Sequence, residues 1–491
     1  MRPMTVFVGP SNTGKSYVAA LIYALQRSLG AAPESTDHSG FSKQLYRDRL
    51  MDSRGGYALS KEDIDQIANW LKETILHSQS SESPSPSLIE LQDSVSEMVQ
   101  SVLENGDFLT PNFESELSRC FGVETTKHLV RNPIRGNSFI TIGREGTSGS
   151  HSATSFKYCY AIEETGANLE ASILNSLPMP IGEEFTGILN SWHWLFIQFQ
   201  DEEDRKREAA TLALSLLATD VAFAMLGPLG RRAFYLPADR AGVMHAHQVV
   251  VRALIAGASR SALRPDFPMP SLSGVLGDFL EQLVTLASAF QQKNTTFDEL
   301  AQDLEHKLLQ GAIRVERSEI DYPSFVYRPS GWERDLPLMN TSSMVSELAP
   351  VVLYLRHVVS PGDLLIIEEP EAHLHPEMQA VFTRQLVAAV QSGVRILITT
   401  HSEWILEELA NLVRLSELPA ECREGIEDPE ISLSPDQLGT WFFEPNEEKG
   451  GSVVREISLD EESATFPAGF GLVTENLYNR WVEISTRIQE I

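Results

Sequence analysis

The chain has 491 residues, which is more than one compact core usually holds, so we expect two or three domains or one large domain with insertions. The 68 acidic residues outnumber the 39 basic residues, and the formal net charge of −29 argues against a surface that coats nucleic acid broadly. The 3 cysteines form no C-x-x-C pair, which argues against a disulfide framework and a cysteine zinc site and favours a reducing compartment, the cytoplasm.

The first predicted element is a short apolar strand, Thr5–Val8, which leads into a glycine-rich loop. The loop satisfies the pattern G-x-x-x-x-G-K-[ST] over eight consecutive residues: Gly9, Pro10, Ser11, Asn12, Thr13, Gly14, Lys15 and Ser16. Apolar residues at helical spacing follow from Val18, which is the context that a phosphate-binding loop requires and which argues against a chance match in a Gly/Ser turn. Because the strand begins so near residue 1, we expect no signal peptide.

The chemistry of such a loop assigns a role to each fixed position. Glycines let successive backbone N–H groups point at one anion, and the N-terminal end of the following helix adds partial positive charge. Lys15 is expected to reach the outer phosphates and the Ser16 hydroxyl to bind Mg²⁺. Tyr17 is the next residue of the predicted nucleotide site.

Residues 31–130 are polar and predict a helical insertion. Ser60 and Asp63 have the spacing of a capping box, in which two side chains satisfy free N–H groups at the start of a helix. The serine- and proline-rich segment Ser78–Ser87 predicts a loop that interrupts the helices.

Residues 131–231 predict antiparallel strands followed by helices. Two β-type runs, 138–142 and 156–162, flank a Gly/Ser-rich turn region and should pair as antiparallel strands. The most membrane-like run, Leu212–Gly230, contains Asp220 near its middle and a proline near its end. It therefore predicts a buried helix and no membrane span.

Residues 232–240 predict a strand that ends in a polar corner. Arg240 at this corner has two interpretations, an ion pair with Asp239, which is favoured, or a contact with phosphate. Three helical patterns follow over residues 243–310, and two β-type runs follow those by residue 327.

The second informative stretch begins with four unbroken aliphatic residues, Leu364–Ile367, which predict a strand buried on both faces, as in a parallel sheet. Glu368 and Glu369 follow at its carboxyl end, where open α/β sheets bind ligands. One carboxylate suits Mg²⁺, and a second suits the orientation and deprotonation of an attacking water. Val394–Thr400 predicts another buried strand that ends at His401, where a histidine can sense a terminal phosphate.

Taken together, the loop, the run LLIIEEPEAHLHP and the run ITTHS resemble the ATPase head of the ABC superfamily. The closest branch is the RecF/SMC-like group, which includes the overcoming-lysogenization-defect (OLD) ATPases and many prokaryotic defence ATPases. The resemblance implies that the chain binds ATP and Mg²⁺ and that Glu368 is the Walker B acid. It further implies that Glu369 is the catalytic base, His401 the switch histidine, Lys15 a catalytic phosphate ligand and Ala372–Pro376 the D-loop.

The implied fold is α/β: a P-loop NTPase of ABC ATPase-head type, with a mostly parallel sheet flanked by helices, an antiparallel subsheet and helical insertions. The head would comprise residues 1–30 and 232–491, with a helical arm at 243–310. Residues 31–130 would form the helical insertion, and residues 131–231 would complete lobe I.

Heads of this group carry a Ser-Gly-Gly-like signature motif that reaches the γ-phosphate of the opposing subunit. The matching segment is Asn340–Glu347, and the resemblance places Ser342 and Ser343 at the nucleotide of a second head. Met344 stands where glycine is usual, and a side chain there hinders close backbone approach. The alternative interpretation of Ser342 and Ser343 is an ordinary helix N-cap.

Three other features affect the assignment. Glu371, His373 and His375 alternate along an extended segment, so a metal site is the alternative to the D-loop. Related heads usually have one or two strands before the loop strand, and here only Met1–Pro3 precede it, so we expect that edge of the sheet to be reduced or covered by a neighbour. No Gln-loop is identifiable.

About ninety residues follow His401, and they predict a hairpin (Trp441–Phe443 with Val453–Ile457) and a final amphipathic helix that includes Leu477 and Trp481. In OLD nucleases a larger Toprim nuclease domain with spaced acidic clusters follows the head, and this segment does not resemble it. We therefore expect any effector to be a separate protein.

The leading hypothesis is a cytoplasmic prokaryotic sensor or regulator, in antiphage defence, whose ATPase heads form a homodimer or higher homo-oligomer. ATP would control how it holds a separately encoded effector such as a nuclease or toxin, an assignment by analogy. One alternative is a RecF-like DNA repair or chromosome-maintenance ATPase that clamps DNA. The net charge does not support DNA binding, although local basic patches such as Arg131–Arg135 do. The other alternative is a scaffold that binds ATP with little turnover.

Overall fold

In the computed structural model of the chain, the described residues are 1–29, 59–80, 89–90, 93–105, 110–129, 138–144, 155–162, 166–172, 176–177, 207, 210–211, 214, 218, 232–263, 272–289, 297–317, 323–446, 450–459, 478–482 and 484. The predictions for Arg131–Arg135, for Leu477 and for most of Leu212–Gly230 lie outside these residues. Within the described ranges, no helix combines the length and the apolar character that crossing a bilayer requires.

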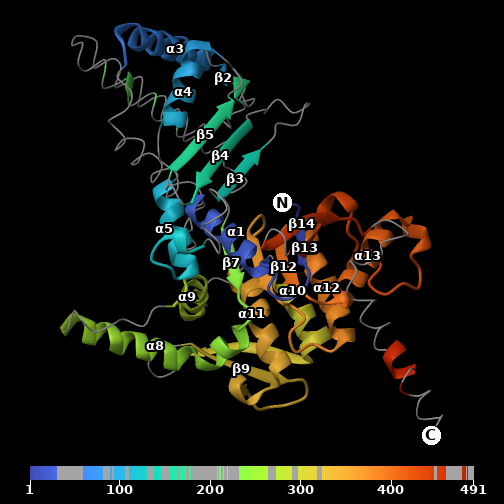
Figure 1. The fold of residues 1–491 in the computed structure, drawn as a ribbon. Coiled ribbons are helices and arrows are strands. Elements are labelled where there is room, and N and C mark those ends of the chain that lie inside the picture. The colour runs from blue at the N-terminus through green and yellow to red at the C-terminus, as the bar shows by residue number, and fades with distance from the viewer. Residues whose placement is uncertain are drawn as a thin grey trace. The chain divides into compact units, whose positions relative to one another are not determined.

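The chain divides into two units (Figure 1). The first unit contains Met1–Tyr23 and Ala233–Ile491, and the second contains Ala24–Arg232. Each unit has its own sheet, and the residues of the candidate site belong to the first.

The first unit is built on a six-stranded sheet with the strand order β14-β13-β1-β12-β11-β7. Its strands are β1 (Met4–Val8), β7 (Ala233–Leu236), β11 (Leu364–Glu368), β12 (Arg395–Thr400), β13 (Leu438–Asn446) and β14 (Gly451–Ile457). All neighbouring pairs are parallel except β13 and β14. The predicted α/β fold with a mostly parallel sheet is therefore confirmed.

Helices and a smaller sheet complete the first unit. The helices are α1 (Lys15–Leu29, which belongs to this unit up to Tyr23), α8 (Arg240–Leu263), α9 (Gly274–Ala289), α10 (Asp298–Leu304), α11 (Ser343–His357), α12 (Pro376–Gln391) and α13 (Glu403–Glu417). The smaller, antiparallel sheet has the order β10-β9-β8, with β8 at Gly311–Arg317, β9 at Pro323–Pro329 and β10 at Leu336–Pro337. The three helices and two β-type runs predicted between residues 243 and 327 are thus present.

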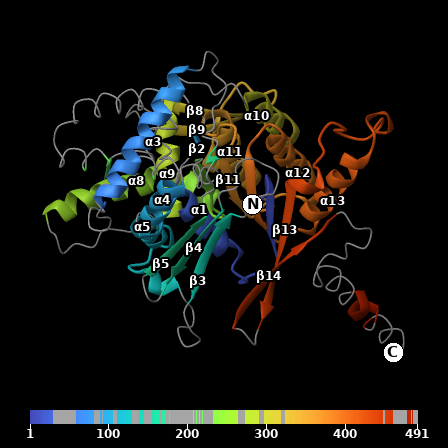
Figure 2. The ribbon, with the colours of Figure 1, turned by 90° about the horizontal axis from the view of Figure 1, so that it is seen from above.

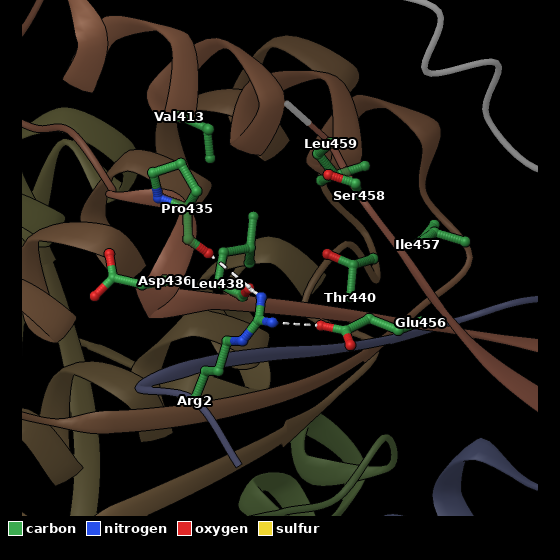
Figure 3. Close-up of a pocket in the computed structure, with 10 residues that line it drawn as sticks. All are labelled: Arg2, Val413, Pro435, Asp436, Leu438, Thr440, Glu456, Ile457, Ser458 and Leu459. Carbon is green, nitrogen blue, oxygen red and sulfur yellow. Dashed lines mark hydrogen bonds and ion pairs between the residues drawn. The ribbon is translucent and has the colours of Figure 1, made fainter. Parts of the chain in front are cut away.

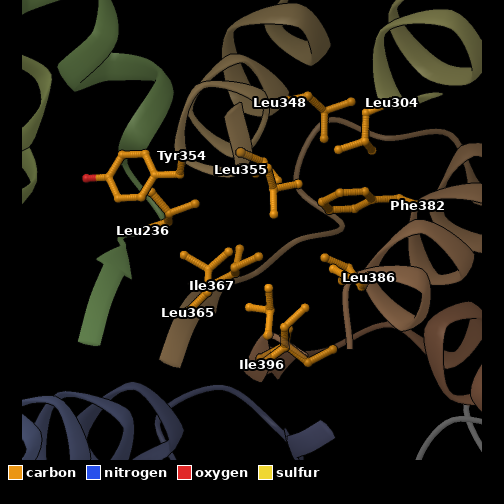
Figure 4. Packing of buried hydrophobic residues seen from close by; sticks show 14 of the residues in the cluster. Leu236, Leu304, Leu348, Tyr354, Leu355, Leu365, Ile367, Phe382, Leu386 and Ile396 are labelled. Atoms are coloured by element: carbon orange, nitrogen blue, oxygen red, sulfur yellow. The ribbon is translucent and has the colours of Figure 1, made fainter. Parts of the chain in front are cut away.

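The core of the first unit lies between the sheet and helices α11 and α12. Figure 4 shows Leu348 and Leu355 of α11 above Ile367 of β11, with Phe382 of α12 and Ile396 of β12 completing the layer. These side chains are almost completely buried, and each contributes about 1.5–3 kcal/mol of hydrophobic stabilisation. Because the middle strands of the sheet are covered on both faces, they carry continuous aliphatic runs instead of alternating residues, as in Leu364–Ile367 of β11 and Ile396–Ile398 of β12.

The C-terminal hairpin lies beside β1 in the six-stranded sheet. Strand β13 pairs in parallel with β1, from Met4 opposite Leu438 to Val8 opposite Phe442, and β14 then pairs antiparallel with β13 (Figure 2). The edge that was expected to be reduced or covered is therefore covered by the chain itself. The predicted hairpin is confirmed, and its outer strand β14 is largely exposed.

The second unit contains a three-stranded antiparallel sheet, β3-β4-β5, which confirms the predicted strand pair and adds a strand. The strands are β3 (Phe139–Arg144), β4 (Ser155–Ala161) and β5 (Gly166–Ser172), with a short pair formed by β2 (Ile89–Glu90) and β6 (Ser176–Leu177). Its helices are α3 (Lys61–Ser80), α4 (Asp93–Asn105) and α5 (Thr110–Phe121).

The start of α3 is capped as predicted. The Asp63 backbone N–H donates to the Ser60 hydroxyl at 3.1 Å, and the Ser60 N–H donates to the Asp63 carboxylate at 2.8 Å. The end of α3 differs from the prediction, because the helix continues to Ser80 whereas the loop was expected from Ser78. Serine lowers helix propensity only slightly, so a formed helix continues through a few such residues, and the prolines that forbid helix occur later.

Candidate nucleotide-binding site

The site lies at one edge of the parallel sheet, where β1, β11 and β12 end. In the strand register, Val8 lies opposite Thr400 and Glu368 lies opposite Thr399. The loop after Val8, the carboxylates after Ile367 and the histidine after Thr400 therefore leave the sheet at the same edge. This is where open α/β sheets bind ligands.

The loop from Gly9 to Ser16 has a backbone that its glycines permit. Gly9 has φ +147° and Gly14 has φ +93°, values that residues with a side chain rarely adopt. A methyl group on Gly9 would lie 2.4 Å from the Phe443 carbonyl oxygen, so only glycine fits against β13. Asn12 also has positive φ, +62°, which asparagine tolerates. The loop thus fits a role as an anion cradle, with α1 beginning at Lys15.

Lys15 is buried inside the loop. Its ammonium group donates hydrogen bonds of 2.8 Å to the carbonyl oxygens of Gly9 and Pro10. Burial lowers the pKa of Lys15 to about 8, although the nearby charges of Glu369 and Glu371 oppose this shift. Lys15 is therefore a cation next to the two acidic residues that follow β11. Ser16 and Tyr17 are exposed at the start of α1.

Glu368 is held from two sides at the end of β11. Its Oε1 accepts a hydrogen bond of 2.8 Å from the Tyr235 hydroxyl, and its Oε2 accepts one of 3.0 Å from the Ala238 N–H. Both donors come from β7 and the turn after it. Each carboxylate oxygen retains a lone pair, so Glu368 keeps the capacity to hold a metal ion in a fixed orientation.

Glu369 and His401 form the exposed end of the site. Glu369 has φ +43°, a strained value for a residue with a side chain, and its N–H donates to the Thr399 carbonyl at 2.8 Å. The Glu369 carboxylate lies 3.9 Å from His401 Nε2. Burial lowers the pKa of His401, and the positive charge of Lys15 lowers it further, so the imidazole is neutral at pH 7.

Arg240 is completely buried and fixes the backbone of both acidic residues. Its Nη1 donates to the Glu368 carbonyl at 2.6 Å and its Nη2 to the Glu369 carbonyl at 3.3 Å, while Nε lies 2.9 Å from Glu347 Oε2. The expected ion pair exists, but the partner is Glu347 of α11 and not Asp239. Adjacent residues on a turn diverge, whereas α11 presents Glu347 directly to Arg240.

The Arg240–Glu347 pair joins α11 to the end of β11. Burial raises the pKa of Glu347, and the Arg240 charge opposes that rise. His373 also approaches this pair, with Nε2 3.9 Å from Glu347 Oε1. A displacement of α11 would therefore displace the backbone at Glu368 and Glu369.

Ser342 and Ser343 lie at the start of α11. The Ser342 hydroxyl accepts a hydrogen bond of 3.4 Å from the Val345 N–H, so Ser342 is the N-cap, as the alternative interpretation proposed. Both serines are exposed, and within the described residues neither forms a hydrogen bond with the loop of its own chain. Met344 packs partly against the core.

Glu371, His373 and His375 do not converge as a metal site. No cluster of three or more His, Cys, Asp or Glu side chains suited to a metal occurs in the described part of the chain. Glu371 instead accepts a hydrogen bond of 2.6 Å from the His401 N–H, and His375 precedes α12 as its N-cap. A Mg²⁺ ion needs fewer protein ligands, because it keeps waters and binds substrate phosphates. Ser16 and Glu368 are the residues present for it.

A cavity of about 510 Å³ lies at the opposite, amino end of β1 and β13 (Figure 3). Its wall includes Leu438, Thr440 and Leu459. Arg2 at its floor is already paired with Glu456 at 2.7 Å and donates to the carbonyls of Pro435 and Leu438. The loop Gly9–Ser16 does not line this cavity, so it is separate from the candidate site.

The sequence alone did not identify several residues of the site. They are Tyr235, Ala238, Glu347, Glu371 in its contact with His401, and Phe443. Glu347 was noticed only as the last residue of the signature-like segment Asn340–Glu347, with no role assigned. The others act through contacts between distant segments.

Residues 273–406 match the family model of an AAA ATPase domain, a span that includes Glu368, Glu369 and His401. No curated protein matches the chain. Among solved structures, the SMC head domain from Thermotoga maritima is similar over 93% of this chain and 90% of that chain, at 11% sequence identity and a TM-score of 0.32.

Two further solved structures cover the same shares of the two chains. One is the SMC head bound to the C-winged helix domain of ScpA, at 8% identity and a TM-score of 0.32. The other is the SMC head with an extended coiled coil bound to the C-terminal domain of ScpA from Pyrococcus furiosus, at 9% identity and a TM-score of 0.31. Because these TM-scores are low, the assignment of the fold rests on the strand order, the loop and the family match.

Proposed function

We propose that this chain, an ATPase of the ABC/SMC-like AAA class, binds ATP with Mg²⁺ at the edge formed by β1, β11 and β12 and hydrolyses it. The ATPase class was predicted from the motifs, and the match of residues 273–406 to the model of an AAA ATPase domain supports it. One observation carries the proposed activity: the loop lysine, the Glu369 carboxylate and a neutral His401 lie together at this edge.

Each residue has a distinct task in the proposed reaction. The loop N–H groups and Lys15 would hold the β- and γ-phosphates, and Ser16 and Glu368 would hold the metal ion. Mg²⁺ bound there would neutralise charge on the phosphates. Glu369 orients a water and accepts its proton as the water oxygen bonds to the γ-phosphorus, and the bond to the β–γ bridging oxygen breaks to release ADP. Neutral His401 contacts the γ-phosphate as a hydrogen-bond donor.

The strained backbone of Glu369 supports its role as the base. A φ of +43° turns the side chain out of the sheet, and the side chain is 44% exposed. The Thr399 carbonyl and the Arg240 guanidinium hold this conformation from both sides. Strain that the surroundings maintain in this way is characteristic of functional sites.

We further propose that the active form is a homodimer or higher homo-oligomer in which Ser342 and Ser343 of one head meet the nucleotide bound to another. ATP binding would then control assembly, and assembly would control a separate effector protein such as a nuclease or toxin. Antiphage defence is the proposed setting, by analogy with the group that the motifs resemble.

A scaffold that binds ATP with little turnover is the second candidate, and Met344 favours it. A packed methionine at this position limits close approach of the backbone to a phosphate. Measuring ATP turnover with and without duplex DNA separates the candidates. DNA stimulation indicates a DNA clamp, turnover without stimulation indicates the proposed regulator, and stable ATP binding without turnover indicates the scaffold.

The Lys15→Ala variant is expected to bind ATP roughly 10- to 150-fold more weakly, because it loses a charged hydrogen bond to phosphate worth about 1.5–3 kcal/mol. Wild-type affinity should also fall as the pH rises from 7 to 9, since a pKa of about 8 means that Lys15 loses its positive charge over this range. Fluorescence titration with a labelled ATP analogue measures both effects.

The pH-dependent loss of affinity should be absent from Lys15→Ala. The exposed Lys61 provides the matched control, and Lys61→Ala should bind ATP as the wild type does at each pH. Equal affinity of Lys15→Ala and wild-type protein at pH 7 would show that the loop is not the nucleotide site.

A double Ser342→Ala/Ser343→Ala variant is expected to bind ATP but not hydrolyse it, and mixing it with Lys15→Ala protein should restore turnover. In an equal mixture up to about a quarter of wild-type turnover is expected, because half of the dimers are mixed and each holds one intact site of two. The assay should use moderate salt, where a Debye length near 8 Å screens repulsion between the acidic chains. Fluorescence transfer should first verify that the subunits exchange. If turnover is then not restored at any mixing ratio of the two variants, a shared site is ruled out.

A further inference from the structure

Glu371 is an acidic residue of the first unit that the proposed reaction does not use. Its Oε1 accepts a hydrogen bond of 2.6 Å from the backbone N–H of His401. Its Oε2 is buried and has no hydrogen-bond partner of normal geometry in the described part of the chain. Burying a carboxylate oxygen without a hydrogen-bond partner costs folding free energy. We therefore expect Glu371 to have a function that compensates for this cost.

Burial raises the pKa of Glu371, and the hydrogen bonds from the His401 N–H and the Thr400 hydroxyl oppose this rise. The anion is thus held chiefly by the short segment at the end of β12. The charge of the Glu371 carboxylate also raises the pKa of Lys15, against the lowering by burial. It lies among the groups that the reaction uses, without being one of them.

We propose that Glu371 is a positioning residue that holds His401 in place beside Glu369, an inference that rests on the proposed ATPase function. Glu369 and Glu371 belong to one turn, in which the Ala372 N–H donates to the Glu369 carbonyl at 3.0 Å. The hydrogen bond from His401 to Glu371 ties this turn to the end of β12. It therefore sets the 3.9 Å separation between Glu369 Oε1 and His401 Nε2.

A second hydrogen bond supports the same junction two residues earlier in both segments. The Glu369 N–H donates to the Thr399 carbonyl, so the turn after β11 is fastened to β12 on both sides of the Glu369 side chain. Ser402, which follows His401, caps α13 through its hydroxyl, and its N–H donates to the Thr400 hydroxyl at 2.9 Å. Loss of Glu371 would then free the backbone at His401 while leaving its two neighbours held.

The Glu371→Ala variant is expected to lower kcat at least about tenfold, the effect of losing one hydrogen bond to a charged group. Its ATP dissociation constant should stay within about threefold of wild type, because the loop and Lys15 are intact. Glu371→Gln keeps an acceptor oxygen for the His401 N–H and should recover most of the turnover. Glu377→Ala, which removes an exposed carboxylate in the first turn of α12, is the matched control and should behave as wild type.

A double-mutant cycle with His401→Ala tests whether Glu371 acts through the histidine. If it does, Glu371→Ala lowers kcat in the wild-type background but has little further effect once His401 is already alanine. If the fold-losses of kcat in the two single variants multiply in the double variant, the inference is wrong. It is also wrong if a folded Glu371→Ala protein has an unchanged kcat. If Glu371→Ala does not fold, two other measurements test the inference. Glu371→Gln should keep wild-type turnover, and the double-mutant cycle with His401→Ala can be run from Glu371→Leu instead.

Failure of this inference differs from failure of the proposed function. Wild-type protein without ATP turnover contradicts the proposed ATPase activity, whatever Glu371 does. Wild-type turnover that Glu371→Ala leaves unchanged contradicts only the positioning role.

Discussion

The Arg240→Met variant is expected to lose about 3–5 kcal/mol of its free energy of unfolding, because removing one partner of a buried ion pair leaves the other charge uncompensated. Arg240 is 0% exposed and Glu347 is 3% exposed, so water cannot replace the lost contact. The carbonyl oxygens of Glu368 and Glu369 lose a donor as well. Urea unfolding of the protein, monitored by near-ultraviolet circular dichroism, measures the change in the free energy of unfolding.

Two variants identify the cause of this destabilisation. Arg240→Met combined with Glu347→Leu should recover much of the lost stability, since apolar residues of similar volume often replace a buried ion pair without cost. Arg414→Met, which removes an exposed arginine from α13, should change stability by no more than about 0.5 kcal/mol. A loss below about 1 kcal/mol in Arg240→Met would mean that Glu347 is not held by this pair.

The Glu369→Gln variant is expected to bind ATP as tightly as wild type and to hydrolyse it at least about a hundredfold more slowly, the usual consequence of losing a general base. Glutamine keeps the shape of the side chain and the hydrogen bond from its N–H to Thr399, so the strained turn should persist. Single-turnover hydrolysis and equilibrium binding, measured on the same preparation, separate chemistry from affinity.

The neighbouring Glu368→Gln variant is the comparison. It should weaken the dependence of ATP binding on Mg²⁺, whereas Glu369→Gln should leave that dependence unchanged. Retained turnover in Glu369→Gln would assign the base to another group, and His401, with Nε2 3.9 Å from Glu369 Oε1, is the candidate.

Much of the site could be predicted because its motifs are local in the chain. The phosphate-binding loop, the two acidic residues after Leu364–Ile367 and the histidine after β12 are each defined by a few consecutive residues. Parallel strands end at a common edge, so three such segments are expected to meet there. The signature-like segment was less predictable, since Ser342 serves as an N-cap in this chain whether or not it also meets a second head.

By itself, the sequence determined the elements whose cause is local. Uninterrupted aliphatic runs specify strands buried on both faces, as in β11, and the spacing of Ser60 and Asp63 specifies a helix start. The conformational freedom of Gly9 and Gly14 specifies a loop that can surround an anion. These features depend on the preferences of neighbouring residues and need no partner from elsewhere in the chain.

Only the tertiary structure decided which distant groups meet. It placed β12 between β1 and β11, set β13 beside β1 and paired Arg240 with Glu347, 107 residues along the chain. It also brought Glu371 to the backbone of His401. A buried charge pairs with the opposite charge or hydrogen-bond donor that the packing of helices and strands brings within about 3 Å. That distance depends on the whole core, which hydrophobic periodicity along the sequence does not specify.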